Sequence, residues 1–295
     1  MPLVESVMQP SNPAARPTSI ESAIPDQALE VCEAAARAGG RVLLDWVGRF
    51  GVSNKGPRDL VTEADLASQR EIRRIVLGAF PDHGFIGEES LPEHAADGQS
   101  ASHPAAGGPP LRWMVDPLDG TSNYVHGFPA WCVSIALARG DEILVGTVYD
   151  PVRDECFTAQ LGAGAFLNGK PIAVSGCVLL SDALVALSFP PHVSPESVAV
   201  ADFLAVVPHI HSARRTGSTA INLAWLACGR LDAFWVRKIA CWDVAAGLLI
   251  FSEAGGCLGG FREGAVSLES VSLDNPAFIA ACTPEVLADL RMRLA

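Results

Sequence analysis

The chain has 295 residues, of which 49% are hydrophobic and 18% are charged, so it is too apolar to be disordered and long enough for one large domain or two smaller ones. Acidic residues outnumber basic ones by 33 to 21, and the formal net charge of −12 argues against nucleic acid as a partner. The most apolar stretches, at 131–138 and 244–251, fall far short of the roughly 20 residues that a membrane span needs. The acidic surplus is explained either by a soluble surface or by carboxylates gathered around a cation.

The first part of the chain predicts a tail, two helices and a series of strands. Residues 1–25 contain several prolines and no continuous apolar core, so we expect a disordered tail and not a secretory signal. Apolar residues at helical spacing predict helices at 27–47 and 66–80, on either side of a polar, turn-like stretch at 54–62. The predicted strands are 84–86, 111–115, 131–138, 143–149 and 156–159, with an exposed loop at 91–110 and a hairpin turn at Asn168-Gly169.

From about residue 180 onward, the pattern alternates between strands and helices. Strands are predicted at 184–189, 233–236 and 277–281, and helices at 195–206, 218–228, 243–254 and from Pro284 onward. Thr283 is the expected N-cap of that last helix, since proline suits the first helical position. We therefore expect sheets covered by helices, in an N-terminal half of residues 26–179 and a C-terminal half of residues 180–295.

The eight cysteines are scattered and form no C-x-x-C pair, which argues against a zinc site and against a disulfide scaffold. Most of them lie among apolar neighbours, so we expect buried free thiols in the reducing environment of the cytoplasm. The histidines form no metal-ligand cluster either, and His126, His209 and His211 are expected at the surface or in packing contacts.

Four acidic segments carry the most specific signal: 59–65, 87–90, 116–121 and the pair Trp242-Asp243. Each follows a predicted strand or begins a predicted helix, where side chains project into a crevice. Taken singly, Asp65 and Asp243 fit helix N-caps better than catalytic groups, and Glu88 fits a solvated turn.

The segment from Asp116 to Thr121 is harder to explain without a ligand. Asp119 follows Asp116 by three residues in a tight turn that Gly120 permits, so the two carboxylates repel each other unless a cation lies between them. Their hard oxygens suit Mg²⁺ or Mn²⁺, and the carbonyl of Leu118 can add a further ligand. A calcium loop does not fit, because the D-x-D-x-D-G pattern with a later glutamate is absent. A phosphate oxygen would be bound by the backbone N–H groups of Gly120, Thr121 and Ser122.

The four segments together resemble the signatures of the inositol monophosphatase family, the lithium-sensitive, magnesium-dependent sugar phosphatases. They read DLVTEAD at 59–65, FIGEES at 85–90, WMVDPLDGTSN at 113–123 and WDVAAG at 242–247. Their order and spacing match the family from about Gln27 to the C-terminus. The resemblance implies a layered αβαβα sandwich, α+β or α/β in class, that assembles as a homodimer and hydrolyses a phosphomonoester with two or three Mg²⁺ ions.

The resemblance also implies roles for single residues. Asp65 and Thr121 match the pair that orients and deprotonates the attacking water, and Lys55 matches a family lysine near the site. Most metal ligands would come from the N-terminal half and the last one from the C-terminal half. The metal ligands would be Glu88, Asp116, the Leu118 carbonyl, Asp119 and Asp243. Glu88 would also be a catalytic residue. The phosphate and the rest of the substrate would be bound by Leu118, Asp119, Gly120, Thr121, Ser122, Gly217, Ser218, Thr219 and Asp243.

The substrate-facing residues depart from the family pattern in two places. Thr219 replaces a small alanine, and Val236 replaces the glutamate that accepts hydrogen bonds from inositol hydroxyls. A valine accepts no hydrogen bond, so the polyol contact is lost unless a neighbour supplies it. We hypothesise that Arg237 or Lys238 faces the pocket and favours a substrate with an additional anionic group. The competing explanation is that both cations point to solvent.

The substrate is therefore left open among a small phosphorylated polyol, histidinol phosphate, fructose 1,6-bisphosphate and phosphoadenosine phosphate. An alternative of a different class is a protein-interaction module that keeps this fold with incidental activity. The complete set of matching ligands favours the phosphatase, because a module used only for docking would be free to lose them.

Overall fold

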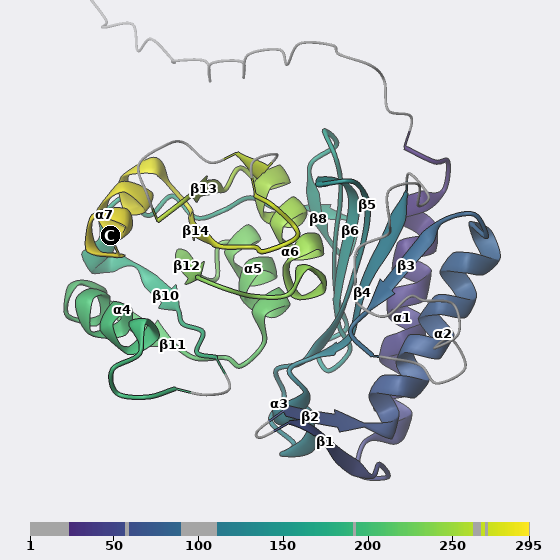
Figure 1. The fold of residues 1–295 in the computed structure, drawn as a ribbon. Helices are drawn as coiled ribbons and strands as arrows, with labels where there is room; N and C mark the ends of the chain where they lie inside the picture. Colours follow the sequence, from purple (N-terminus) through teal and green to yellow (C-terminus); the bar gives the residue numbers. More distant parts are fainter. Residues whose placement is uncertain are drawn as a thin grey trace, which may run out of the picture.

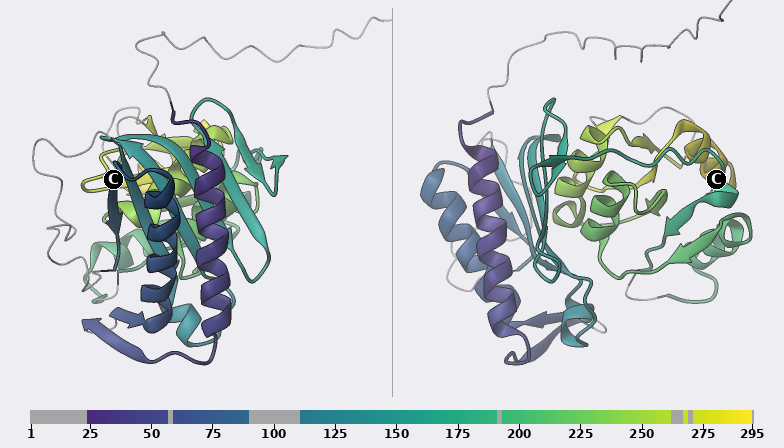
Figure 2. Two further views of the ribbon diagram at one scale, coloured as in Figure 1. Left: turned by 90° about the vertical axis from the view of Figure 1, so that its right-hand side faces the viewer. Right: turned by 180° about the vertical axis from the view of Figure 1, so that it is seen from behind.

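Five alternating layers of helices and strands make up the protein (Figure 1). Two helices cover one face of a seven-stranded sheet, two more lie between it and a five-stranded sheet, and two cover the far side (Figure 2). The predicted αβαβα sandwich is confirmed. The computed structural model describes residues 24–56, 59–89, 111–190, 193–261, 267–268 and 271–294. Residues 1–23 of the predicted tail and the predicted loop at 91–110 lie outside the described residues.

The seven-stranded sheet and its outer helices form the N-terminal part. Its strand order is β3-β4-β5-β6-β7-β8-β9, and all neighbours are antiparallel except the parallel pair β3 and β4. The strands are β3 (Gly84–Gly87), β4 (Arg112–Asp119), β5 (Cys132–Arg139), β6 (Glu142–Asp150), β7 (Glu155–Gln160), β8 (Ala165–Leu167) and β9 (Lys170–Pro171). The helices are α1 (Ala28–Trp46) and α2 (Glu63–Ala79) on the sheet face, and the short α3 (Thr121–Val125) beyond the end of β4.

The five-stranded sheet and four helices form the C-terminal part. Its order is β11-β10-β12-β14-β13, in which β10 is parallel to β11 and β12, and β14 is antiparallel to β12 and β13. The strands are β10 (Leu184–Ala186), β11 (Ser212–Arg214), β12 (Ala233–Val236), β13 (Cys257–Gly259) and β14 (Phe278–Ala281). The inner helices are α5 (Thr219–Ala227) and α6 (Cys241–Glu253), and the outer ones are α4 (Val198–Val206) and α7 (Pro284–Leu294).

Three buried apolar cores separate the layers. The first contains Trp113 and lies between α1, α2 and the seven-stranded sheet. The second contains Phe157 and Phe251 and joins both sheets through α5 and α6. The third contains Val286 and lies between the five-stranded sheet and α7. Helix α6 is buried along 244–251, which explains why this stretch is so apolar in the sequence. Within the described part of the chain, no helix has the length and apolar character that crossing a membrane takes.

Most predicted elements are present, and the differences have local causes. The stretch at 54–62 was expected to be a turn, but it contributes to an antiparallel hairpin of β1 (Val52–Gly56) and β2 (Asp59–Thr62). The hairpin turn at Asn168-Gly169 is confirmed, with positive φ angles of 48° and 74°. The N-cap at Thr283 is also confirmed, because its hydroxyl accepts the N–H of Val286 at 3.4 Å. The sequence missed β8, β9, β11 and β13, which have three residues or fewer.

All eight cysteines are free thiols, as predicted, but only four of them are buried and the other four are half-buried. The cytoplasmic location stays a prediction. The division of the chain at residue 180 also stays a prediction, and it falls in the connection between the two sheets, after β9 and before β10.

Candidate active site

Glu88 is fixed at the carboxyl end of β3, beside β4. Because β3 and β4 are parallel, with Gly87 opposite Val115, the residues that follow on both strands lie at the same edge of the sheet. The Glu88 N–H donates to the Val115 carbonyl at 3.0 Å. Glu89, which follows Glu88, is bound by the side-chain amide of Gln69 on α2. This amide donates to the Glu89 carbonyl at 2.6 Å and accepts the Glu89 N–H at 3.0 Å. A Cβ at Gly87 would lie 2.2 Å from the Gln69 Oε1, so this close approach requires glycine.

A bulge at the end of β4 sets the direction of the aspartates on this strand. Asp116 pairs with Ser134 on β5, but Asp119 pairs with Cys132, so one extra residue of β4 is accommodated between them. Asp116 Oδ1 accepts the N–H of Leu118 at 2.9 Å, which fixes the carboxylate within the bulge. Gly120 follows with a φ of 96°, and a Cβ there would lie 2.9 Å from the Ala130 carbonyl oxygen.

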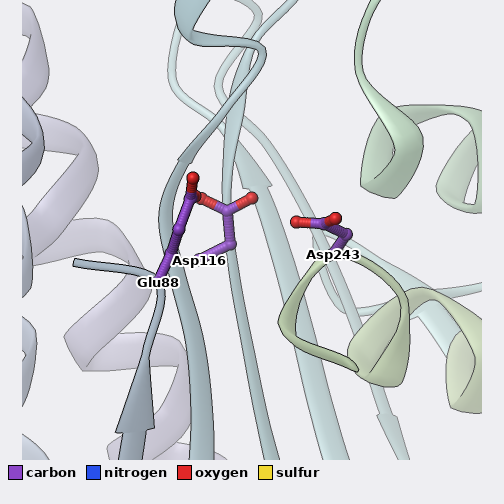
Figure 3. A group of neighbouring side chains, drawn as sticks. All are labelled: Glu88, Asp116 and Asp243. Atoms are coloured by element: carbon purple, nitrogen blue, oxygen red, sulfur yellow. The ribbon is translucent and has the colours of Figure 1, made fainter. Parts of the chain in front are cut away.

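Asp243 approaches the same point from the other side of the pocket. It lies in the first turn of α6, whose N-cap position is held by Ala240, so the expectation that Asp243 is the N-cap is wrong. The Ser134 hydroxyl donates to the Trp242 carbonyl at 3.1 Å and ties this turn to β5. Glu88, Asp116 and Asp243 therefore converge, with one carboxylate oxygen of each within 4.8 Å of the others (Figure 3).

Asp116 and Asp243 are buried beside other acidic groups, which disfavours their charged forms. Burial raises the pKa of Asp116 well above its ordinary value, and the charges of Glu88, Asp243 and Asp119 raise it further. The pKa of Asp243 is raised well above its ordinary value by burial, followed by the charges of Asp119 and Glu88. A divalent cation among these oxygens would remove the repulsion, and the donor set, made only of hard carboxylate oxygens, fits Mg²⁺ or Mn²⁺.

Asp119 lies next to this group, but one of its oxygens is already engaged. Asp119 Oδ2 accepts the hydroxyl of Ser218 at 2.6 Å and the N–H of Ala220 at 2.6 Å, both at the start of α5. Burial raises the pKa of Asp119 to about 6, although these hydrogen bonds act to lower it. The carboxylate is thus held in one orientation, which leaves Oδ1 for another partner.

Asp65 contacts Thr121 and also caps the start of α2. Thr62 is the N-cap of this helix, which begins at Glu63 and not at Leu66 as expected. Asp65 is the third helical residue, and its Oδ2 accepts the Thr62 N–H at 2.9 Å in a capping box. Its Oδ1 lies 3.3 Å from the Thr121 hydroxyl, which is also 3.1 Å from the Leu118 carbonyl oxygen. Asp65 is fully buried, whereas Thr121 is half-buried and lines the pocket, so only the carboxylate side of this contact is shielded from water.

A pocket of about 280 Å³ brings most of the predicted site residues together. Its walls include Glu88, Asp116, Leu118, Asp119, Gly120, Thr121, Ser122, Gly217, Ser218, Thr219 and Asp243. Asp65 lies behind Thr121 and does not line the pocket. Lys55 belongs to β1, and its side chain lies outside the described part of the structure.

The two cations after Val236 do not line this pocket. Arg237 donates to both oxygens of Asp202, at 2.6 and 2.8 Å, and to the Leu294 carbonyl at 2.6 Å. Its guanidinium also stacks over the Phe261 ring, 4.0 Å from the centroid. The hypothesis that Arg237 faces the catalytic pocket is therefore wrong, and Lys238 is exposed beside a neighbouring cavity.

Other residues of the pocket were missed by sequence reasoning. Asn123 donates to the Ala130 carbonyl at 2.6 Å and to the Thr216 carbonyl at 2.8 Å, which holds the segment before α5 against α3. Its place in the 113–123 signature was the signal that could have indicated it. Arg215 is an exposed cation in the pocket wall, and its closeness to Gly217 could have drawn attention to it. The remaining missed residues are Leu187, Ser188, Phe189, Asn222 and Ile239.

The chain is similar to known proteins over most of its length. The model of the inositol monophosphatase family matches residues 25–293. The chain is 39% identical over 245 residues to an inositol-1-monophosphatase of Rhizobium meliloti, a match that covers 82% of this chain and 88% of that protein. It is 38% identical over 232 residues to a fructose-1,6-bisphosphatase/inositol-1-monophosphatase of Aquifex aeolicus, covering 77% and 83%. The crystal structure of the extragenic suppressor protein suhB from Bartonella henselae superposes with a TM-score of 0.80 at 34% identity, covering 91% and 98%.

Proposed function

The chain belongs to the inositol monophosphatase family and is a phosphomonoesterase of that type, and we propose that it uses Mg²⁺ to hydrolyse a small phosphorylated metabolite. The observation that carries this proposal is the convergence of Glu88, Asp116 and Asp243 in one pocket with the hydroxyl of Thr121. The metal ligands would be these three carboxylates together with Asp119 and the Leu118 carbonyl. Two metal ions in such a site would stabilise charge on the phosphate and lower the pKa of an attacking water.

The chain's own residues would position the reactants. Asp65 Oδ1 accepts the hydroxyl hydrogen of Thr121, which leaves the lone pairs of the threonine oxygen to accept a hydrogen from the attacking water. The N–H groups of Gly120, Thr121 and Ser122, at the start of α3, would bind a phosphate oxygen. Phosphoryl transfer mostly requires positioning and charge neutralisation, and these groups would supply both.

For the substrate, we propose a class of compound and not a single molecule. Relatives are named for inositol phosphates and, in one case, also for fructose 1,6-bisphosphate, so we propose a phosphorylated metabolite of comparable size. We also propose that the protein assembles as a homodimer. A role in docking alone is disfavoured, because such a role gives no reason to gather mutually repelling carboxylates in one pocket.

Phosphate release from a panel of sugar and alcohol phosphates, measured with Mg²⁺ and with EDTA, tests the proposal. We expect release with Mg²⁺ and none with EDTA. Asp116→Asn should nearly abolish release, because it removes the charge of a central ligand without changing its size. If no ester in the panel is hydrolysed in a metal-dependent way, the proposed function is wrong.

A further inference from the structure

A second cavity, of about 650 Å³, lies beside the catalytic pocket. The two share Ser188, Phe189 and Ile239 in their walls, so the two cavities adjoin at these residues. This volume is within the range of 300–1,000 Å³ that is typical of small-molecule sites. The cavity therefore lies where the part of a substrate beyond its phosphate would be placed.

The described wall of this cavity is mostly apolar. Trp235 and Val236, at the end of β12, form one side, and Val198, at the start of α4, forms another. Phe189 and Ile239 line both the cavity and the catalytic pocket. Val236 thus contributes to an apolar surface at the position where family members that act on inositol phosphates carry a glutamate.

The charged groups in the wall are largely engaged with each other. Asp202 is buried, and both of its oxygens accept hydrogen bonds from Arg237. The only other side-chain acceptor among the described residues of this wall is the hydroxyl of Ser188. Lys238 is exposed at the edge, where its ammonium group stays in water. A polyol bound here would therefore lose water from several hydroxyls and find few partners in exchange.

We propose that the preferred substrate is a phosphomonoester whose leaving alcohol carries an apolar ring, with the phosphate at the carboxylates and the ring in the second cavity. The inference rests on the proposed phosphatase function. Water adds its oxygen to phosphorus, the ester P–O bond breaks, and the leaving alcohol takes up a proton as inorganic phosphate remains. The aromatic side chains of Phe189 and Trp235 in the wall favour a flat ring, and the cavity adjoins the catalytic pocket, so the ring would be attached close to the phosphate.

The test compares kcat/KM for 2-phenylethyl phosphate and for glycerol 3-phosphate, both with Mg²⁺. We expect the ring ester to be preferred by at least about 10-fold, within the range by which an apolar pocket discriminates. Val198→Asp places a charge at the cavity wall, on a side chain that is 54% exposed, and should reduce this preference about 10-fold. Leu204→Asp is the matched control, because Leu204 lies on the same helix, is 61% exposed and does not line the cavity. It should leave the preference unchanged.

The outcomes separate this inference from the function on which it rests. Metal-dependent release from both esters without a preference would overturn the inference and leave the phosphatase intact. A preference that Val198→Asp does not reduce would also overturn it. If Val198→Asp changes the oligomeric state and not the preference, the cavity is covered by a second copy of the chain and the inference is wrong. If neither of these esters nor any ester of the wider panel is hydrolysed in a metal-dependent way, both the inference and the proposed phosphatase function are wrong.

Discussion

The Ser218 hydroxyl donates a hydrogen bond of 2.6 Å to Oδ2 of Asp119, and this contact joins the start of α5 to the end of β4. The same oxygen accepts the N–H of Ala220 at 2.6 Å. The Asp119 carboxylate, on the seven-stranded sheet, is therefore oriented by α5, which lies between the two sheets. The active site depends in this way on how the two parts of the chain are joined, and not only on the residues of the acidic segments.

Ser218→Ala is expected to weaken the response to Mg²⁺. Without the hydroxyl, Asp119 Oδ2 keeps the Ala220 N–H and the weak thiol donor of Cys132 at 3.9 Å, and it is held less firmly. Loss of such a supporting hydrogen bond typically lowers metal affinity or activity by about 10–100-fold. The Mg²⁺ concentration that gives half-maximal phosphate release should rise accordingly. Ser218 is also the N-cap of α5, so the free energy of unfolding should fall by about 1 kcal/mol.

Ser218→Thr is the control for this experiment, since it keeps a hydroxyl that can cap α5 and donate to Asp119. Its Mg²⁺ requirement should stay close to that of the wild type. An unchanged Mg²⁺ requirement in Ser218→Ala would show that Asp119 needs no support from α5.

Thr121→Val should reduce turnover without changing the Mg²⁺ requirement. The valine keeps the shape of threonine but removes the hydroxyl that lies 3.3 Å from Asp65 Oδ1. Loss of a group that accepts a proton in the transition state typically costs about 10²–10⁴-fold in rate, and kcat should fall within that range. Thr121→Ser, which keeps the hydroxyl, should retain most of the activity. A Thr121→Val variant with near-normal kcat would contradict the role of this pair.

The sequence predicted what is encoded locally. The acidic segments, the tight turn at Gly120 and the N-cap at Thr283 each depend on neighbours in the chain, and each was found from residue type and spacing. The capping box of Thr62 and Asp65 is equally local, and recognising it would have placed the start of α2 at Glu63. Strands β8, β9, β11 and β13 were missed, because runs of two or three residues carry little periodic signal.

What depends on tertiary contacts could not be predicted. The partner of Arg237 is Asp202, which lies 35 residues earlier on α4, and nothing in the local sequence pairs them. The same holds for the contact between Asn123 and the Thr216 carbonyl, across 93 residues. The apolar character of the second cavity likewise results from the meeting of α4 with the end of β12. The metal-ligand segments could therefore be predicted from the sequence, whereas the walls of the substrate site could not, because they are formed by residues from distant parts of the chain.

Arg237→Ala is expected to reduce stability and to leave phosphate chemistry intact. It removes both hydrogen bonds to Asp202, which is only 5% exposed, and leaves that carboxylate without its cation. Hydrogen bonds to charged groups contribute about 1.5–3 kcal/mol, so the free energy of unfolding in urea should fall by about 2 kcal/mol. The double variant Arg237→Ala/Asp202→Ala should recover part of this loss, because no unpaired carboxylate remains. A large fall in kcat for glycerol 3-phosphate would show instead that Arg237 acts on the reaction.

The clustered carboxylates predict that the metal-free protein loses stability as the pH rises. Folding raises the pKa of Asp119 from 3.8 to about 6 and raises those of Asp116 and Asp243 as well. A carboxyl with a raised pKa favours the folded state fully below its unfolded value, and this contribution is lost as the pH passes through the folded value. Thermal unfolding in EDTA should therefore show a falling Tm between about pH 4 and pH 7, and excess Mg²⁺ should offset the fall because it binds the ionised form. Asp116→Asn should flatten the EDTA curve and raise Tm at pH 7, so an EDTA curve as steep as that of the wild type would contradict the repulsion inferred for this site.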